Sequence, residues 1–149
     1  MNLKYAVVER ERRYLLASLP DQLTRTFEIV DRYISGTRLR LRELRDEDGR
    51  VTRKLGHKVR LSDGPADVAC TNMYLNEQEW DLLSSLPARL LRKQRHVVQH
   101  DGLTVAIDEY DDGTLVAEID DRDQPAQSVL TVVADVSGDE QWTGAALAR

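Results

Sequence analysis

Residues 4–15, KYAVVERERRYL, are the stretch from which the fold can be argued. With the two-residue period of a β-strand, one face carries Tyr5, Val7, Glu9, Glu11 and Arg13. Carboxylates on neighbouring same-side positions lie only about 7 Å apart. Each raises the cost of ionising the other unless a cation, such as a divalent metal ion, lies between them. An edge strand with a solvent-exposed charged face is the alternative interpretation.

Composition limits the class of protein. The chain has 149 residues, of which 41% are hydrophobic and 32% charged, so we expect one soluble globular domain spanning 1–149. We find neither an apolar run of membrane-spanning length nor the apolar core of a signal peptide, and we expect a cytoplasmic protein without membrane partners. The single cysteine, Cys70, excludes an internal disulfide and is expected to be a small buried apolar residue.

The distribution of charge indicates the kind of ligand. A net charge of −5 argues against a sequence-independent nucleic-acid binder, which needs a basic surface. Basic residues are nevertheless concentrated in residues 38–42, 53–54, 58–60 and 92–95. This pattern favours a small polyanionic ligand.

The hairpin after residue 38 can pair in two registers. Residues 38–45, RLRLRELR, predict a strand with a cationic and an apolar face, which in isolation favours an exposed amphipathic strand. A two-residue turn would place Arg42 opposite Leu55. A three-residue loop with a left-handed Gly49 would instead place Arg42 opposite Lys54 and Arg38 opposite Lys58. We favour this second register, which gathers five cations on one face and requires a compensating anion.

A second charged hairpin is predicted after residue 90. Residues 91–98 and 103–110 flank the turn pair Asp101 and Gly102, which would place Arg95 opposite Asp108 and Lys93 on the same face. A further loop ending at a left-handed Gly113 would place Glu118 opposite Ala106, with Asp120 on the same face.

Two helices and a last strand complete the predicted elements. Asn76 and Glu79 have the spacing of a capping box, so a helix with an apolar side should begin there. We also predict a strand over residues 128–136 and a short helix over residues 143–149. His57, His96 and His100 lack metal-ligand spacing and are expected at the surface. Neither a GxSxG nor a P-loop motif is present.

Strands that each carry one charged and one apolar face cannot form an ordinary β-sandwich, whose inner faces are apolar. They can form a barrel with a polar lumen, whose apolar residues point outward against covering helices. On these residues the chain resembles the CYTH, or triphosphate tunnel metalloenzyme, superfamily. Its motifs are similar to residues 9–13 (ExExK), 36–40 (GTRxR), 52–54 (TxK), 93–95 (KxR), 108–110 (aspartate before an aromatic residue), 117–120 (AExE) and the closing segment 137–148.

The resemblance implies an α+β, mainly β fold: an eight-stranded antiparallel closed barrel, or tunnel, with covering helices. It implies that the tunnel binds a triphosphate through Arg13, Arg38, Arg40, Lys54, Lys93 and Arg95. It implies that Mg²⁺ or Mn²⁺ is held by Glu9, Glu11, Asp108, Glu118 and Asp120. Catalysis would rest on Glu11, Lys93 and Arg95.

Three positions depart from the superfamily pattern. Arg13 stands where lysine is usual, Ala106 where several members carry an acid, and Asp120 where glutamate is more frequent. Arginine keeps the charge but changes its donor geometry, and aspartate shortens the carboxylate arm by one methylene. Activity could survive all three changes with a different metal preference.

We therefore expect a metal-dependent hydrolase of triphosphate or inorganic polyphosphate. A non-catalytic module that binds polyphosphate or an organic phosphate, and a class IV-type adenylyl cyclase that makes cyclic AMP from ATP, are the alternatives. The exposed helices could form a homodimer interface.

Overall fold

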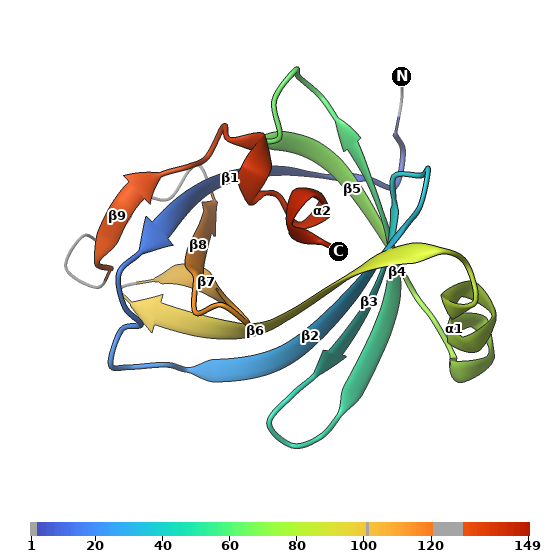
Figure 1. Ribbon diagram of the computed structural model, residues 1–149, viewed down its shortest axis with the longest axis horizontal. Helices are drawn as coiled ribbons and strands as arrows, with labels where there is room; N and C mark the ends of the chain where they lie inside the picture. Colours follow the sequence, from blue (N-terminus) through green and yellow to red (C-terminus); the bar gives the residue numbers. More distant parts are fainter. Residues whose placement is uncertain (1–2, 101, 121–129) are drawn as a thin grey trace.

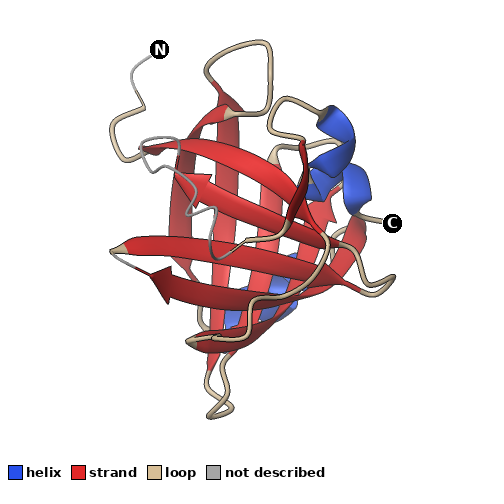
Figure 2. Cartoon of the chain, turned by 90° about the vertical axis from the view of Figure 1, so that its left-hand side faces the viewer, coloured by secondary structure: helices blue, strands red, loops and turns tan. Residues whose placement is uncertain are grey.

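The computed structural model describes residues 3–100, 102–120 and 130–149. The strands of these residues are β1 (Val7–Leu16), β2 (Arg25–Ile34), β3 (Leu39–Arg45), β4 (Val51–Arg60), β5 (Asp67–Tyr74), β6 (Ala88–His100), β7 (Leu103–Tyr110), β8 (Leu115–Asp120) and β9 (Val132–Asp135). Within the described chain, the first eight close an antiparallel barrel in the order β1–β5–β4–β3–β2–β6–β7–β8, and β8 pairs back to β1 (Figures 1 and 2). This confirms the predicted barrel. β9 adds to the end of β1.

Strand pairing places the charged residues on the inner face. Directly opposed residues of neighbouring strands share a face of the sheet. The ladders pair Arg13 with Glu118 and Arg95 with Asp108. Arg13, Arg95 and Glu118 line the cavity of the barrel and Asp108 lies on the same face of the sheet, as the alternation of charged residues predicted.

Glycine turns fix two of the registers. Gly49 has φ +83° and closes the β3–β4 hairpin, in which Arg42 pairs with Lys54, so the three-residue loop is confirmed. Gly113 has φ +85° and precedes β8, in which Glu118 pairs with Ala106, also as predicted. Residues that have a Cβ rarely adopt such a φ. Of the third predicted turn, Asp101 lies outside the described residues, but the predicted pairing of Arg95 with Asp108 is present.

The main apolar core lies on the outside of the barrel. It joins outward-facing residues of β1, β6, β7 and β8 to Leu130, with Leu19 packed against it. Ile107, Ala117 and Ile119 at its centre are at most 1% exposed. Among the described residues, Leu19 before β2 and Leu130 before β9 cover this side, and neither belongs to a helix.

The described residues form two α-helices and a short 3₁₀-helix: α1 (Glu77–Ser84), η1 (Glu140–Trp142) and α2 (Gly144–Leu147). The predicted capping box is present, since Asn76 and Glu79 exchange side-chain-to-backbone hydrogen bonds of 2.8 and 2.9 Å. Each α1 residue, all of them described, keeps some exposure, and Leu82 is 73% exposed. No helix in the described ranges is long and apolar enough to cross a membrane.

The C-terminal elements are shorter than predicted. β9 covers Val132–Asp135 of the predicted strand, whose first residue, Ser128, lies outside the described residues. The last helix is the single turn of α2, which lies across one end of the barrel in Figure 1.

Candidate functional site

The barrel encloses a cavity of about 470 Å³. Among the described residues that line it, ten are basic and three are acidic. The basic residues are Arg13, Arg38, Arg40, Arg42, Lys54, Lys58, Arg60, Arg89, Lys93 and Arg95, and the acidic residues are Glu9, Glu11 and Glu118. Like charges in one enclosed space repel each other, so this cavity favours an anionic ligand. All six predicted phosphate-binding residues lie in this lining.

Asp31 holds two of the cations from beneath the lining. Its fully buried carboxylate accepts hydrogen bonds of 2.7 Å from both Nε and Nη2 of Arg42. The Nε of Arg40 is 3.9 Å from the same carboxylate. Burial opposes ionisation of Asp31, but the hydrogen bonds and charge of Arg42 outweigh it and lower the pKa. Asp31 therefore remains anionic and fixes the Arg42 guanidinium.

Asp108 of β7 has the equivalent role for two cations of the neighbouring strand β6. It accepts hydrogen bonds from Lys93 Nζ at 2.7 Å and from Arg95 Nε and Nη2 at 2.7 and 2.9 Å. Its burial is outweighed by the charges of Lys93 and Arg95, which lower its pKa. Although we predicted a metal ligand here, Asp108 is outside the cavity lining and its oxygens neutralise two predicted catalytic cations.

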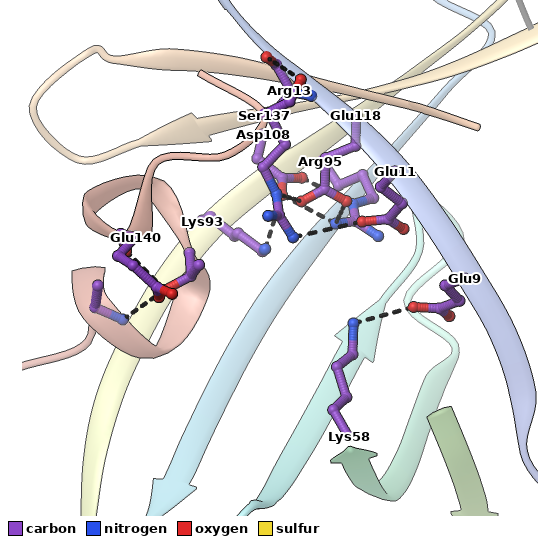
Figure 3. A network of polar contacts seen from close by, with 12 residues as sticks. Glu9, Glu11, Arg13, Lys58, Lys93, Arg95, Asp108, Glu118, Ser137 and Glu140 are labelled. Atoms are coloured by element: carbon purple, nitrogen blue, oxygen red, sulfur yellow. Dashed lines mark hydrogen bonds and ion pairs between the residues drawn. The ribbon is translucent and has the colours of Figure 1, made fainter. Parts of the chain in front are cut away.

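The acidic residues of the lining are paired with cations (Figure 3). Arg13 lies 3.5 Å from both Glu11 and Glu118, and Glu118 is also 3.4 Å from Arg95. Lys58 Nζ donates to Glu9 at 3.1 Å. Burial, followed by the charge of Glu118, raises the pKa of Glu11 to about 7. A cation placed between these carboxylates would oppose that shift.

The predicted metal ligands do not converge into one preformed centre. The described residues contain no group of three or more His, Cys, Asp or Glu side chains arranged to hold a metal ion. The ion pairs with basic residues account for Glu9, Glu11, Asp108 and Glu118. Asp120 pairs with Glu11 in the β1–β8 ladder, but the cavity lining, as far as the chain is described, does not include it.

Two buried donor atoms of lining residues have no acceptor among the described residues. Arg13 Nη1 and Arg40 Nε are buried without a hydrogen-bond partner among the described residues. Lys54 has a lowered pKa because it is buried and close to Arg42 and Arg40. Buried donors normally have an acceptor, so the described residues leave Arg13 Nη1 and Arg40 Nε unsatisfied.

The C-terminal segment forms part of the cavity wall. Thr143, Gly144 and Ala145 line the cavity, and a Cβ added to Gly144 would collide with Tyr33 Oη. Arg89 donates to the carbonyl of Ala145, while Leu90 and Arg149 exchange backbone hydrogen bonds of 2.7 and 2.9 Å. These contacts hold the segment across the end of the barrel.

No family model and no curated protein sequence matches this chain. Solved structures do match it. A conserved hypothetical protein from Pyrococcus furiosus has a TM-score of 0.53 and 14% identity, covering 80% of this chain and 83% of its own. The PH1012 protein from Pyrococcus horikoshii OT3 has a TM-score of 0.50 and 12% identity, covering 74% and 77%. The likeness is one of fold alone.

Two buried polar residues were missed or misplaced by sequence reasoning. Asp31 was given no role from the sequence, although its two-residue spacing from Ile29 and Tyr33 could have placed it on the inner face. His96 is 6% exposed, bonded to Thr26 Oγ1 at 3.1 Å and to Glu109 at 2.7 Å, so the predicted surface position is wrong. Cys70 is buried as predicted and lines the cavity.

Proposed function

We propose that this protein binds a triphosphate or inorganic polyphosphate inside the barrel and hydrolyses its terminal anhydride with the help of Mg²⁺ or Mn²⁺. The observation that carries the proposal is the enclosed cavity lined by ten basic residues within the described chain. Guanidinium groups match phosphate oxygens in a bidentate geometry, and several cations at once suit a ligand with several phosphoryl groups. The resemblance to the CYTH superfamily supports the same ligand.

Glu9, Glu11 and Glu118 are the cavity residues that would hold the divalent cation, because hard cations favour carboxylate oxygen. Mg²⁺ is commonly bound by one or two carboxylates together with substrate phosphates, so three converging protein ligands are not required. When bound, the ion offsets negative charge on the phosphate oxygens.

The basic residues of the cavity would have different roles, depending on which carboxylate each of them already contacts. Arg38, Arg40 and Lys54 would bind phosphate oxygens directly. Lys93 and Arg95 are fixed by Asp108, so they would present charge to the phosphoryl group with little rearrangement. Arg13 lies between Glu11 and Glu118 and would neutralise them until a metal ion binds.

A non-catalytic phosphate-binding module is the second candidate. It is favoured by the pairing of each lining carboxylate with a basic side chain, and by the lack of a converging acidic trio among the described residues. Such a module would bind tripolyphosphate tightly and leave it intact.

The test is phosphate release from tripolyphosphate by the pure protein with Mg²⁺ or Mn²⁺, with cyclic AMP measured in parallel on ATP. We expect phosphate release that Glu11→Gln abolishes and that the exposed α1 control Glu77→Gln preserves. Binding without release would select the binding module, and cyclic AMP formation would select the cyclase. If the protein neither binds nor hydrolyses tripolyphosphate, the proposal is refuted.

A further inference from the structure

Gly56 lies among the basic residues that line the cavity of the barrel. It occupies the inner face of β4 between Lys54 and Lys58, opposite Arg40 of β3 and Asn72 of β5. Its backbone is not in the left-handed region that requires glycine. A glycine inside a strand weakens the strand, and it often marks a place where another group comes close to the backbone. Since the φ angle does not require glycine here, such a group is the expected reason.

The reason is the position of the Arg40 head group. A Cβ added to Gly56 would lie 3.3 Å from Arg40 Nη2 and 3.1 Å from Asn72 Oδ1. Both distances are tighter than ordinary contacts between a Cβ and its neighbours. The guanidinium therefore lies close over the backbone of Gly56, and a Cβ there would require it to shift by a few tenths of an ångström.

Arg40 held in this way has unused capacity to bind an anion. Its Nε is buried without a hydrogen-bond partner among the residues that the structure describes, and Asp31 is 3.9 Å away. Asp31 gives its short hydrogen bonds to Arg42 instead. Arg40 is part of the cavity lining, and its guanidinium carries five N–H donors, so an oxyanion in the cavity could accept from it.

We propose that Gly56 is a positioning residue for the anion site: its missing side chain seats the Arg40 guanidinium across β4, where it binds a phosphoryl oxygen. The inference rests on the proposed phosphate ligand, but not on hydrolysis. A side chain at position 56 would displace Arg40 and weaken anion binding while the fold persists.

The test is the dissociation constant of tripolyphosphate, measured by calorimetry without divalent metal. We expect Gly56→Ala to weaken binding about tenfold, equivalent to ~1.4 kcal/mol. Gly64→Ala is the matched control, since a Cβ there meets nothing within 4 Å and its φ lies outside the left-handed region. Circular dichroism and thermal unfolding should show that Gly56→Ala remains folded.

A double-mutant cycle separates positioning from a general structural effect. If Gly56 acts through Arg40, Gly56→Ala should have little further effect in an Arg40→Met background. Equal affinity of Gly56→Ala and wild type would overturn the inference, as would full additivity of the two changes. Binding without hydrolysis by wild type would refute only the hydrolase, whereas no binding of tripolyphosphate would refute both proposals.

Discussion

At the scale of single residues, Asp31 and Asp108 hold basic residues of the cavity lining in place without being part of that lining. Both are fully buried, and each carboxylate receives short hydrogen bonds from arginine or lysine. Desolvating such charges is expensive, so the pairs are better understood as fixing positions than as adding stability. Removal of one partner leaves the other buried and uncompensated.

Asp31→Asn should therefore reduce the free energy of unfolding by about 3–5 kcal/mol, because the buried Arg42 loses its counter-charge. The folded pKa of Asp31 is lowered from its ordinary value of 3.8, so its contribution is present above that pH and is lost as pH falls through the folded value. Urea unfolding between pH 7 and pH 3 measures both effects, with exposed Asp63→Asn as control. A loss below about 1 kcal/mol at pH 7 would contradict this role.

Glu11 predicts the opposite dependence on pH. Its folded pKa is raised from 4.5 to about 7, so its contribution to stability is full below pH 4.5 and is lost as pH rises through 7. In the absence of metal, the wild type should lose about 2–3 kcal/mol relative to Glu11→Gln between pH 4.5 and pH 8. Urea unfolding across this range tests it. Parallel curves for the two proteins would show that Glu11 titrates normally.

At the scale of secondary structure, α1 depends on its cap because its residues keep some exposure. Asn76→Ala should cost the helix about 1 kcal/mol. The loss should appear as faster hydrogen exchange of α1 amides, including that of Trp80, which donates to the Asn76 carbonyl. Gln78→Ala, two residues after Asn76 and outside the capping box, is the control. Equal acceleration in the barrel strands would mean that α1 stabilises the whole fold.

Local signals explain why some elements could be predicted. Gly49 and Gly113 indicate left-handed positions in the turns. Each fixes a hairpin register, and the register decides which charged side chains lie on the same face of the sheet. The apolar cover could not be predicted in the same way. Leu19 and Leu130 reach the outer core through tertiary packing from outside the strands, and no periodic pattern links them to β7.

The candidate site was predictable to a similar extent. Two-residue alternation identified cavity residues such as Arg40 and Glu118, because pleat parity depends only on spacing. It could not identify their partners. Whether Asp108 neutralises Lys93 or joins other carboxylates depends on distances across strands, which sequence spacing leaves undetermined.

At the scale of the whole molecule, charge is separated between surface and interior. The chain carries a net charge of −5, yet basic residues outnumber acidic ones in the cavity lining of the described chain. Folding therefore gathers cations that would be far apart and well solvated in the unfolded chain. A bound polyanion relieves their repulsion in the folded state alone, so ligand binding and stability should be linked.

Tripolyphosphate should consequently raise the melting temperature without any metal ion. At one hundred times its dissociation constant it adds about 2.7 kcal/mol, which corresponds to roughly 5–10 °C for a domain of this size. Lys54→Met should reduce the shift because it removes a cavity cation, whereas exposed Lys4→Met should leave it unchanged. Scanning calorimetry with tripolyphosphate and with orthophosphate at equal concentration measures the effect. Equal shifts from the two anions, or an undiminished shift in Lys54→Met, would show that binding occurs on the surface, because only a site with several converging cations distinguishes a chain of phosphates from a single one.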